Sequence, residues 1–139
     1  MSPQMLAVVN EAEHAVGRLP QIAIATEHLF HGGMYARTVR IPAQSVITGT
    51  LLNIPTILII HGNAKVLTNA GWIEIEGYAV LPGSAGRKQA FVALSTVEMT
   101  MVFPTQAKTV EDAERECTDE FEKLISRRSD SDIVVVTEE

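Results

Sequence analysis

The chain has 139 residues, of which 46% are hydrophobic and 20% charged, and its formal net charge is −6. This length and composition are typical of one globular domain and exclude a disordered protein. The charge is uneven: the segment from Lys108 onward carries 11 acidic and 5 basic residues, whereas residues 1–107 carry 6 of each. Because no basic stripe is present to neutralise phosphates, we predict no nucleic-acid partner.

The sequence also argues against membrane contact and secretion. Its longest apolar run, residues 54–60, is far shorter than the roughly 20 residues that a membrane span requires. The N-terminus lacks a basic region followed by an apolar core, so no secretory signal is expected. A single cysteine, Cys117, excludes an internal disulfide framework and fits a reducing compartment.

The chain begins with a helical pattern and then changes to short strands. Apolar residues at helical spacing predict a short helix over Pro3–Val16, which Gly17 and Leu19-Pro20 end. A hairpin is expected at residues 66–72, where Gly71 supplies a positive backbone angle. Many short strands at even spacing are typical of a sandwich or barrel, so the fold is predicted to be mainly β. The predicted strands are residues 35–41, 45–48, 57–60, 64–67, 72–75, 78–81, 89–94 and 97–103.

The C-terminal segment carries the acidity and has a helical period again. Thr109 is a suitable N-cap, and acidic residues crowd the first turn of a helix predicted over residues 110–126. The tail, residues 129–139, places an apolar β-former between acidic flanks, which predicts either a disordered end or a strand that docks elsewhere. Candidate interaction residues in these two segments are Phe121, Leu124, Ile125, Ile133, Val134, Val135 and Val136.

Between residues 19 and 105, several glycine- and proline-marked motifs follow one another in a set order. They are Leu19-Pro20, Gly33-x-Tyr35-x-Arg37, Ile41-Pro42-Ala43, Ile47-Thr48-Gly49, Gly62, Pro82-Gly83 and Phe103-Pro104-Thr105. In this order and spacing they resemble the cupin superfamily, and most closely the small cupin-domain proteins encoded in bacteriophage and prophage genomes. The resemblance implies a single jelly-roll barrel over residues 19–107, preceded by a helix (1–18) and followed by an acidic helix (108–128) and a tail (129–139).

Members of that family hold a metal through two histidines in the first motif and a further histidine from the later strands. The resemblance places Leu52 and Thr56 at the first pair, and Gln89 and Phe103 where the later histidine is expected. Transition metals need imidazole, thiolate or carboxylate donors. These four vestigial pocket positions therefore imply no metal and no other cofactor, and they favour a non-catalytic protein over an enzyme.

Three further features leave alternatives open. Leu52, Thr56, Phe103 and also Trp72 either fill the barrel or line an apolar cavity for a small ligand, and their bulk favours filling. Residues 83–88, Gly-Ser-Ala-Gly-Arg-Lys, could grip an anion, although a hairpin loop is favoured because the spacing is not that of a phosphate loop. Glu27, His28 and His31 could form a relocated metal site, but residues three apart in a strand point to opposite faces.

These observations predict a non-catalytic, metal-free phage-type cupin that acts through protein–protein contact, as a virion component or as a protein that binds a host factor. The alternative is a metal-free cupin that sequesters or senses a small molecule. We expect self-association, most simply as a two-fold dimer, with other phage proteins or a host protein as further partners. The expected location is the host cytoplasm or the virion.

Overall fold

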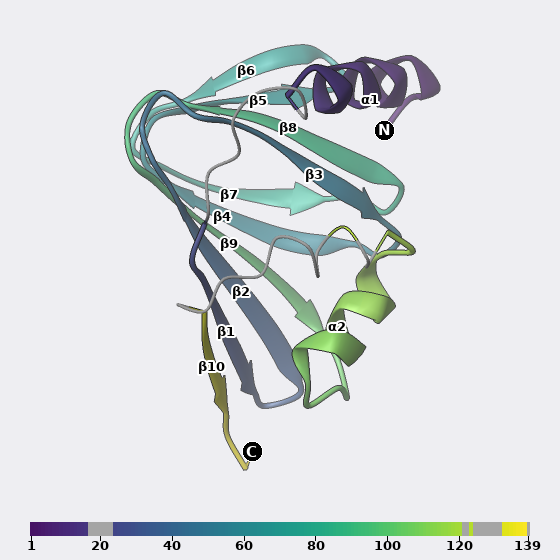
Figure 1. The fold of residues 1–139 in the computed structure, drawn as a ribbon, viewed down its shortest axis with the longest axis vertical. Coiled ribbons are helices and arrows are strands. Elements are labelled where there is room, and N and C mark those ends of the chain that lie inside the picture. The colour runs from purple at the N-terminus through teal and green to yellow at the C-terminus, as the bar shows by residue number, and fades with distance from the viewer. Residues whose placement is uncertain (17–23, 121–122, 124–131, 139) are drawn as a thin grey trace.

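The computed structural model describes residues 1–16, 24–120, 123 and 132–138, so Phe121, Leu124 and Ile125 lie outside the described residues. Neither helix described is long and apolar enough to cross a membrane. In chain order (Figure 1) the elements are α1 (Pro3–Val16), β1 (Thr26–His31), β2 (Met34–Ile41), β3 (Val46–Leu52), β4 (Thr56–His61), β5 (Ala64–Thr68), β6 (Gly71–Ile75), β7 (Tyr78–Gly83), β8 (Arg87–Ala93), β9 (Val97–Pro104), α2 (Val110–Cys117) and β10 (Ile133–Val136).

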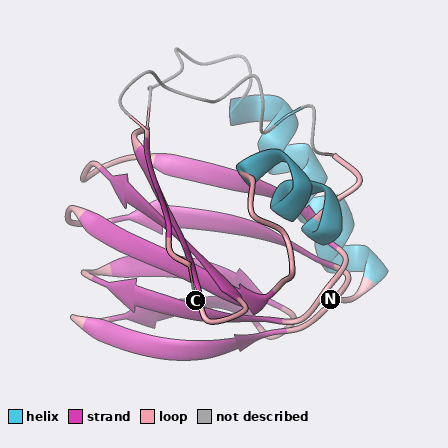
Figure 2. Ribbon diagram, turned by 90° about the horizontal axis from the view of Figure 1, so that it is seen from below, coloured by secondary structure: helices cyan, strands magenta, loops and turns pink. Residues whose placement is uncertain are grey.

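The strands form two facing sheets, which Figure 2 shows with the helices gathered at one side. One sheet has six strands in the order β10-β1-β2-β9-β4-β7, and the other has four in the order β3-β8-β5-β6. The mainly β, jelly-roll prediction is confirmed. Among the described strands, however, no ladder of hydrogen bonds joins the two sheets, so the strands do not close into the expected barrel.

Alternation of side chains explains how each strand contributes to the core between the sheets. In β4, Thr56, Leu58 and Ile60 are buried, whereas Ile57 and His61 are exposed, because successive residues point to opposite faces. The main cluster of buried apolar residues comes from both sheets and consists of Ile41, Leu58, Ile60, Ala64, Val66, Ile75, Phe91, Ala93 and Val97.

The predicted hairpin is present as β5 and β6, and Gly71 begins β6 with φ +98°. Trp72, which the sequence offered as a barrel-filling residue, is instead half exposed on the outer face. The reason is the parity of β6: Ile75 is in the core, so Ile73 shares its side and Trp72 and Glu74 point outward.

Helix α1 covers the outer face of the four-stranded sheet. Val9 is fully buried and packs against Leu67 and Ala90 of that sheet. Its attachment to the sheet rests on this packing and on the polar contacts described next.

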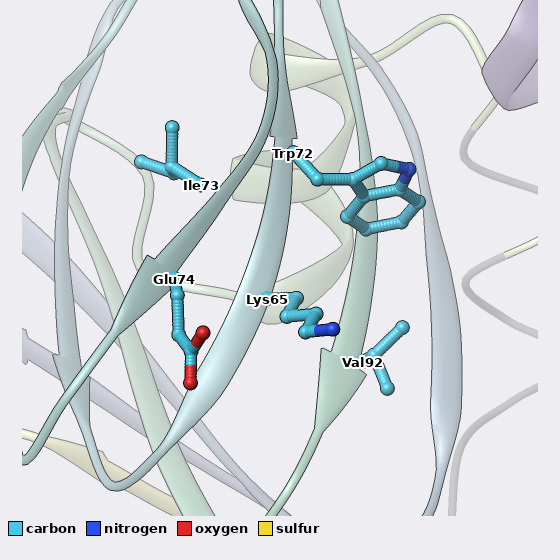
Figure 3. A pocket seen from close by; sticks show the side chains of 5 residues that line it. All are labelled: Lys65, Trp72, Ile73, Glu74 and Val92. Atoms are coloured by element: carbon cyan, nitrogen blue, oxygen red, sulfur yellow. The ribbon is translucent and has the colours of Figure 1, made fainter.

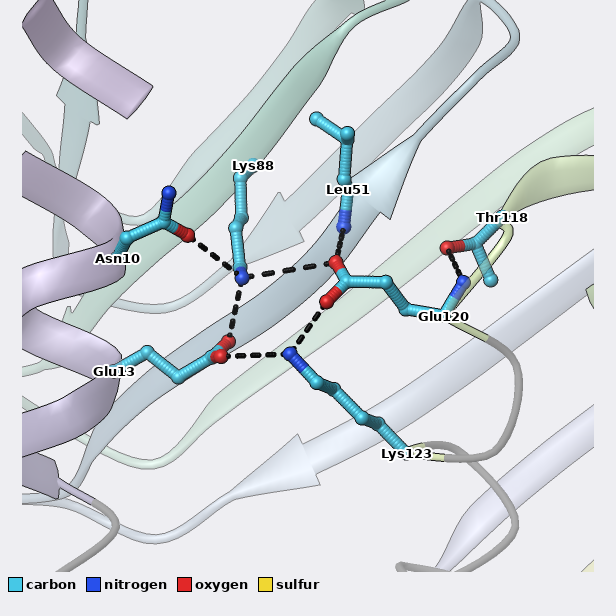
Figure 4. Close-up of polar contacts among 7 residues, drawn as sticks. All are labelled: Asn10, Glu13, Leu51, Lys88, Thr118, Glu120 and Lys123. Carbon is cyan, nitrogen blue, oxygen red and sulfur yellow. Dashed lines mark hydrogen bonds and ion pairs between the residues drawn. The ribbon is translucent and has the colours of Figure 1, made fainter. Parts of the chain in front are cut away.

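Lys88 fastens α1 and the segment after α2 to the same outer face (Figure 4). Its side chain is almost fully buried, and Nζ donates to Asn10 Oδ1 at 2.9 Å. The ammonium lies 3.0 Å from Glu13 Oε2 and 3.6 Å from Glu120 Oε1. Glu120 Oε1 also accepts from the backbone N–H of Leu51 at 2.7 Å. One buried cation therefore ties three parts of the chain together.

The helix predicted over residues 110–126 starts as expected but ends early. Thr109 is the N-cap and accepts from the Asp112 N–H at 3.3 Å, yet α2 stops at Cys117. Thr118 is extended, and its hydroxyl accepts from the Glu120 N–H at 3.0 Å, a local bond that competes with further helix formation. The Cys117 carbonyl accepts from the Asn53 N–H at 2.7 Å and is thus satisfied without another helical turn.

The tail supplies a strand, which is one of the two alternatives that the sequence left open. β10 pairs in parallel with β1 of its own chain, so the six-stranded sheet includes a strand from beyond residue 107, where the predicted barrel segment ends. Asp132 Oδ1 accepts from the Thr26 N–H at 2.9 Å, and the Thr137 N–H donates to the Phe30 carbonyl at 3.0 Å. Docking here satisfies the edge of β1, which would otherwise present unpaired backbone groups.

Candidate functional site

Two of the four predicted pocket positions are filled by apolar packing. Leu52 and Phe103 are 6% and 1% exposed, and they share a cluster with Phe30 and Tyr35. The Phe103 ring meets the Tyr35 ring edge-on at 5.2 Å between centroids. Helix α2 closes the cluster with Val110, Ala113 and Cys117. This end of the interior is therefore packed, as the filling alternative requires.

The other two positions, Thr56 and Gln89, lie in a polar part of the interior beside Arg87. Arg87 opens β8 and pairs with Leu52 of β3, and its Nη2 crosses to donate to Thr56 Oγ1 of β4 at 2.5 Å. A Cβ at Gly83 would lie 2.2 Å from Arg87 Nη2, so the guanidinium packs directly on the glycine and would have to shift if another residue stood there. Sequence reasoning did not single out Arg87, although the Gly-rich, basic segment 83–88 was a signal for it.

Arg87 and Gln89 both carry donors without partners. No carboxylate of the described residues forms an ion pair with Arg87, and its Nε is buried with no hydrogen-bond partner. Burial lowers the pKa of the Arg87 guanidinium, because the charged form has lost hydration. Gln89 Nε2 is likewise buried and unpartnered. Buried polar groups are normally satisfied, so each such atom calls for an explanation.

The residues present do not fit the metal that the fold family implies. Within the described part of the chain, no group of three or more His, Cys, Asp and Glu side chains lies close enough to hold a metal ion. The polar interior instead presents a hydroxyl, an amide and a guanidinium, none of which is a usual transition-metal ligand. The positive charge of Arg87 also opposes a cation at this place.

His28 and His31 lie on opposite faces of β1, as the two-residue period of a strand predicts. His28 is buried, and its Nδ1 lies 2.6 Å from the Tyr35 hydroxyl, whereas His31 is on the exposed face beside Thr137. Burial raises the pKa of Tyr35 well above its ordinary value, so this hydroxyl keeps its proton and can donate. His28 Nε2 is 3.7 Å from Asp132 Oδ2, which makes the pair part of the docking of β10. Glu27, His28 and His31 therefore do not converge on a metal site.

A surface pocket of about 430 Å³ lies on the outer face of the four-stranded sheet (Figure 3). Trp72 and Val92 supply its apolar side chains, and Lys65 and Glu74 occupy paired positions of β5 and β6. Its wall also includes Ile73. Among the described residues, no side chain that lines this pocket has a buried polar atom without a hydrogen-bond partner. The pocket differs in this from the interior around Arg87 and Gln89.

The outer face of the six-stranded sheet carries a row of apolar residues, which we call the apolar row. Strand register places one member on every strand. Leu29, Ile57 and Val135 are 43%, 52% and 49% exposed. No described helix packs on this face, since α1 contacts β3 and β8 and α2 packs on the interior cluster. The apolar row consists of Val135, Leu29, Ala36, Val102, Ile57 and Pro82.

The predicted interaction residues of the tail divide between the two sides of β10. Ile133 and Val135 pair with Glu27 and Leu29 on the outer side. Val134 and Val136 pair with the buried His28 and Phe30, on the inner side. All four tail residues remain about half exposed, because β10 is the edge strand.

Comparisons with known proteins show the fold. No protein-family model and no curated protein matches the chain. An ectoine synthase from P. lautus superposes with a TM-score of 0.53 and 16% identity, over 70% of this chain and 75% of that one. A cupin superfamily protein from Desulfitobacterium hafniense superposes with a TM-score of 0.52 and 12% identity, over 64% of this chain and 84% of that one. At these identities the likeness concerns architecture alone: the chain has the cupin fold.

Proposed function

We propose that this chain is a non-catalytic cupin-fold protein that acts through protein–protein contact, and that its first partner is a second copy of itself. The observation that carries the proposal is the apolar row. Exposed apolar patches of this extent on one face are typical of interaction sites. The donor set beside Arg87, a hydroxyl, an amide and a guanidinium, suits neither a metal nor acid–base catalysis by a carboxylate or histidine, which supports a binding role over an enzymatic one.

A second copy of the chain is a suitable partner because the outer face of the six-stranded sheet is complementary to itself. Beside the apolar row, Arg40 and Glu98 form an exposed pair at 2.6 Å, so each copy offers both signs of charge to its mate. A two-fold contact sets the same patch against itself and requires such self-complementarity. Six strands about 4.8 Å apart span roughly 24 Å, and about six residues of each strand give an area on the order of 500 Å² per copy. Two copies then bury about 1,000 Å², which is near the lower limit for a specific interface.

Light scattering on the purified chain at about 50 μM tests the proposal, because a weak interface of micromolar affinity associates in that range. We expect a dimer for the unchanged chain and monomers for Ile57→Lys and Val80→Lys, which place a charge on the six-stranded face. Val80 is 55% exposed and lies on β7 next to β4. Val46→Lys is the matched control, since Val46 is 44% exposed on the other sheet. A monomeric unchanged chain, or a dimer that survives both substitutions, contradicts the proposal.

The narrower expectation, a phage virion component or a protein that binds a host factor, rests on the resemblance of residues 19–105 and stays a prediction. If it is right, the same face is the first place to look for the further partner. The alternative function, small-molecule binding, also stays a prediction.

A further inference from the structure

We propose that the free edge of β6 binds an extended peptide segment of a partner protein, which adds a strand to the four-stranded sheet and places basic side chains beside Glu74 and Trp72. The inference goes beyond the proposed self-association, because β6 belongs to one sheet and the apolar row lies on the other. It rests on an unprotected strand edge, on the exposed side chains along that edge and on the charge that they carry.

The backbone of β6 is open to a further strand on one side. β6 ends the four-stranded sheet and pairs with β5 alone. In an antiparallel pair every second residue turns its N–H and C=O away from the partner strand, so an edge strand presents a row of unpaired backbone groups. The three middle residues, Trp72, Ile73 and Glu74, are all exposed, with Trp72 at 50% and Ile73 at 36%. This edge is therefore accessible to a partner.

The edges of β3, β7 and β1 are each protected against a further strand. β3 has a bulge between Thr48 and Leu51, and the Leu51 N–H already donates to Glu120 Oε1 at 2.7 Å. β7 contains Pro82, which has no N–H to donate. The edge of β1 is covered by β10 of the same chain. β6 has neither a bulge in its register with β5 nor a proline, although such devices are how native proteins keep strand edges from pairing.

The side chains of β6 give the edge an apolar centre and a negative charge. Trp72 and Glu74 lie on the outer face and Ile73 faces inward, so an added strand meets the two faces in alternation. Glu74 pairs in register with Lys65, yet within the described part of the chain no ion pair joins them. Figure 3 shows the Glu74 carboxylate turned away from the Lys65 Nζ. Glu76, which is also exposed, follows the strand.

A partner strand with the order basic, apolar, basic complements this edge. A lysine or arginine opposite Glu74 can donate to its carboxylate, and opposite charges on neighbouring strands stabilise a sheet. The next basic residue on the same face reaches Trp72, where a cation gains a contact with the ring. Trp72 borders the surface pocket of about 430 Å³, which leaves room for this side chain. The apolar residue between them faces Ile73.

A second copy of β6 is a poorer occupant of the same edge. In an antiparallel pair of two β6 strands centred on Ile73, each Trp72 lies opposite the Glu74 of the other copy. Such a pair supplies no cation to either carboxylate. A register that sets Glu74 opposite Glu74 is disfavoured, because like charges directly opposite each other destabilise a sheet. The charge of the edge therefore favours a basic segment of a different protein.

The fluorescence of Trp72, the only tryptophan of the chain, reports binding at this edge. A short peptide of alternating lysine and valine is titrated into the full chain at constant ionic strength, beside a matched peptide of glutamate and valine. We expect the lysine peptide to saturate and to shift the Trp72 emission to shorter wavelength, because the ring loses contact with water. The glutamate peptide should not bind.

Reversing one charge separates this site from general attraction to an acidic protein. Glu74→Lys should lose at least about fivefold in affinity for the lysine peptide and should bind the glutamate peptide instead, because a favourable cross-strand pair becomes a repulsive one. Glu11→Lys is the matched control: it makes the same change in net charge at an exposed position of α1 and should bind as the unchanged chain does. Ile57→Lys should also bind normally, which separates this inference from the proposed self-association.

Amide hydrogen exchange followed by nuclear magnetic resonance tests whether the peptide adds as a strand. Every second N–H of β6 should exchange more slowly in the complex, and a lysine peptide that is N-methylated at alternate residues should not bind, because it lacks main-chain donors. Absence of binding, an equal loss in Glu74→Lys and Glu11→Lys, or binding without slower exchange in β6 overturns the proposal. A dimer that survives Ile57→Lys but is lost in Trp72→Ala would assign the edge to a second copy and would also overturn it.

Discussion

Replacing Phe103 by alanine tests whether the end of the interior near α2 is a packed core. Phe103 is 1% exposed, meets the Tyr35 ring edge-on and shares its cluster with residues of α2. Truncating a buried phenylalanine to alanine typically lowers the free energy of unfolding by about 3–5 kcal/mol, because the substitution removes buried apolar surface and also leaves a cavity. The edge-on pair with Tyr35 accounts for roughly 0.5–1.5 kcal/mol of such a loss. Because α2 closes the cluster from a second side, the site cannot collapse easily, and we expect a value in the upper half of the range.

Urea unfolding followed by circular dichroism measures the change in the free energy of unfolding. The slope against urea should stay the same, so that a lower midpoint reports stability alone. Val46→Ala is the control: it truncates an exposed side chain on the other sheet and should change stability by less than about 0.5 kcal/mol. A loss below about 1 kcal/mol for Phe103→Ala would be typical of an exposed residue. That result would refute the packed interior.

Three further outcomes follow from buried charges and the thiol. Lys88→Met should lower the free energy of unfolding by about 2–3 kcal/mol in the same urea assay. This loss is smaller than for a fully buried ion pair, because the side chains of Glu13 and Glu120 are 21% and 25% exposed. An unchanged midpoint would show that Lys88 does not hold α1 and the segment after α2 on the sheet. Burial alone raises the pKa of Glu13 and of Glu120, but the hydrogen bonds and charges of Lys123 and Lys88, together with the Leu51 N–H at Glu120, outweigh it and lower both pKa values below the ordinary one. Since the folded pKa values are depressed, this stability is present above the unfolded pKa and lost as the pH falls through the folded values. The thermal midpoint should therefore drop as the pH falls below the ordinary pKa of a glutamate carboxyl group, and it should drop less in the double variant Glu13→Gln, Glu120→Gln; equal drops would refute the assignment. Burial raises the pKa of the Cys117 thiol to about 11, so Ellman's reagent should label it only as fast as the chain unfolds, and rapid labelling of the folded chain would show an accessible thiol.

The sequence by itself determined the strands that are short apolar segments between turn residues. β4 and β9 are read directly from their apolar residues, and the β5–β6 hairpin follows from the glycine that its turn requires. The N-cap at Thr109 was also visible, because a capping hydroxyl acts within one turn. β1 is missing from the predicted strands, although a strand period was assumed in weighing His28 and His31. Its inward positions include Thr26 and His28, polar residues that only the docking of β10 and the Tyr35 hydroxyl make suitable for burial.

Tertiary structure decided the features that matter for function. Helix α2 ends at Cys117 because Asn53 and Thr118 satisfy its last turn, and β10 is a strand of its own sheet because the edge of β1 was open. The sequence placed Arg87 and Lys88 in a hairpin loop, whereas in the structure they begin β8 and point to opposite faces of that strand. Which of them faces the interior depends on the side covered by α1, because β8 has buried residues on both of its faces. With Lys88 engaged by Glu13 under α1, Arg87 lies between the sheets and donates to Thr56.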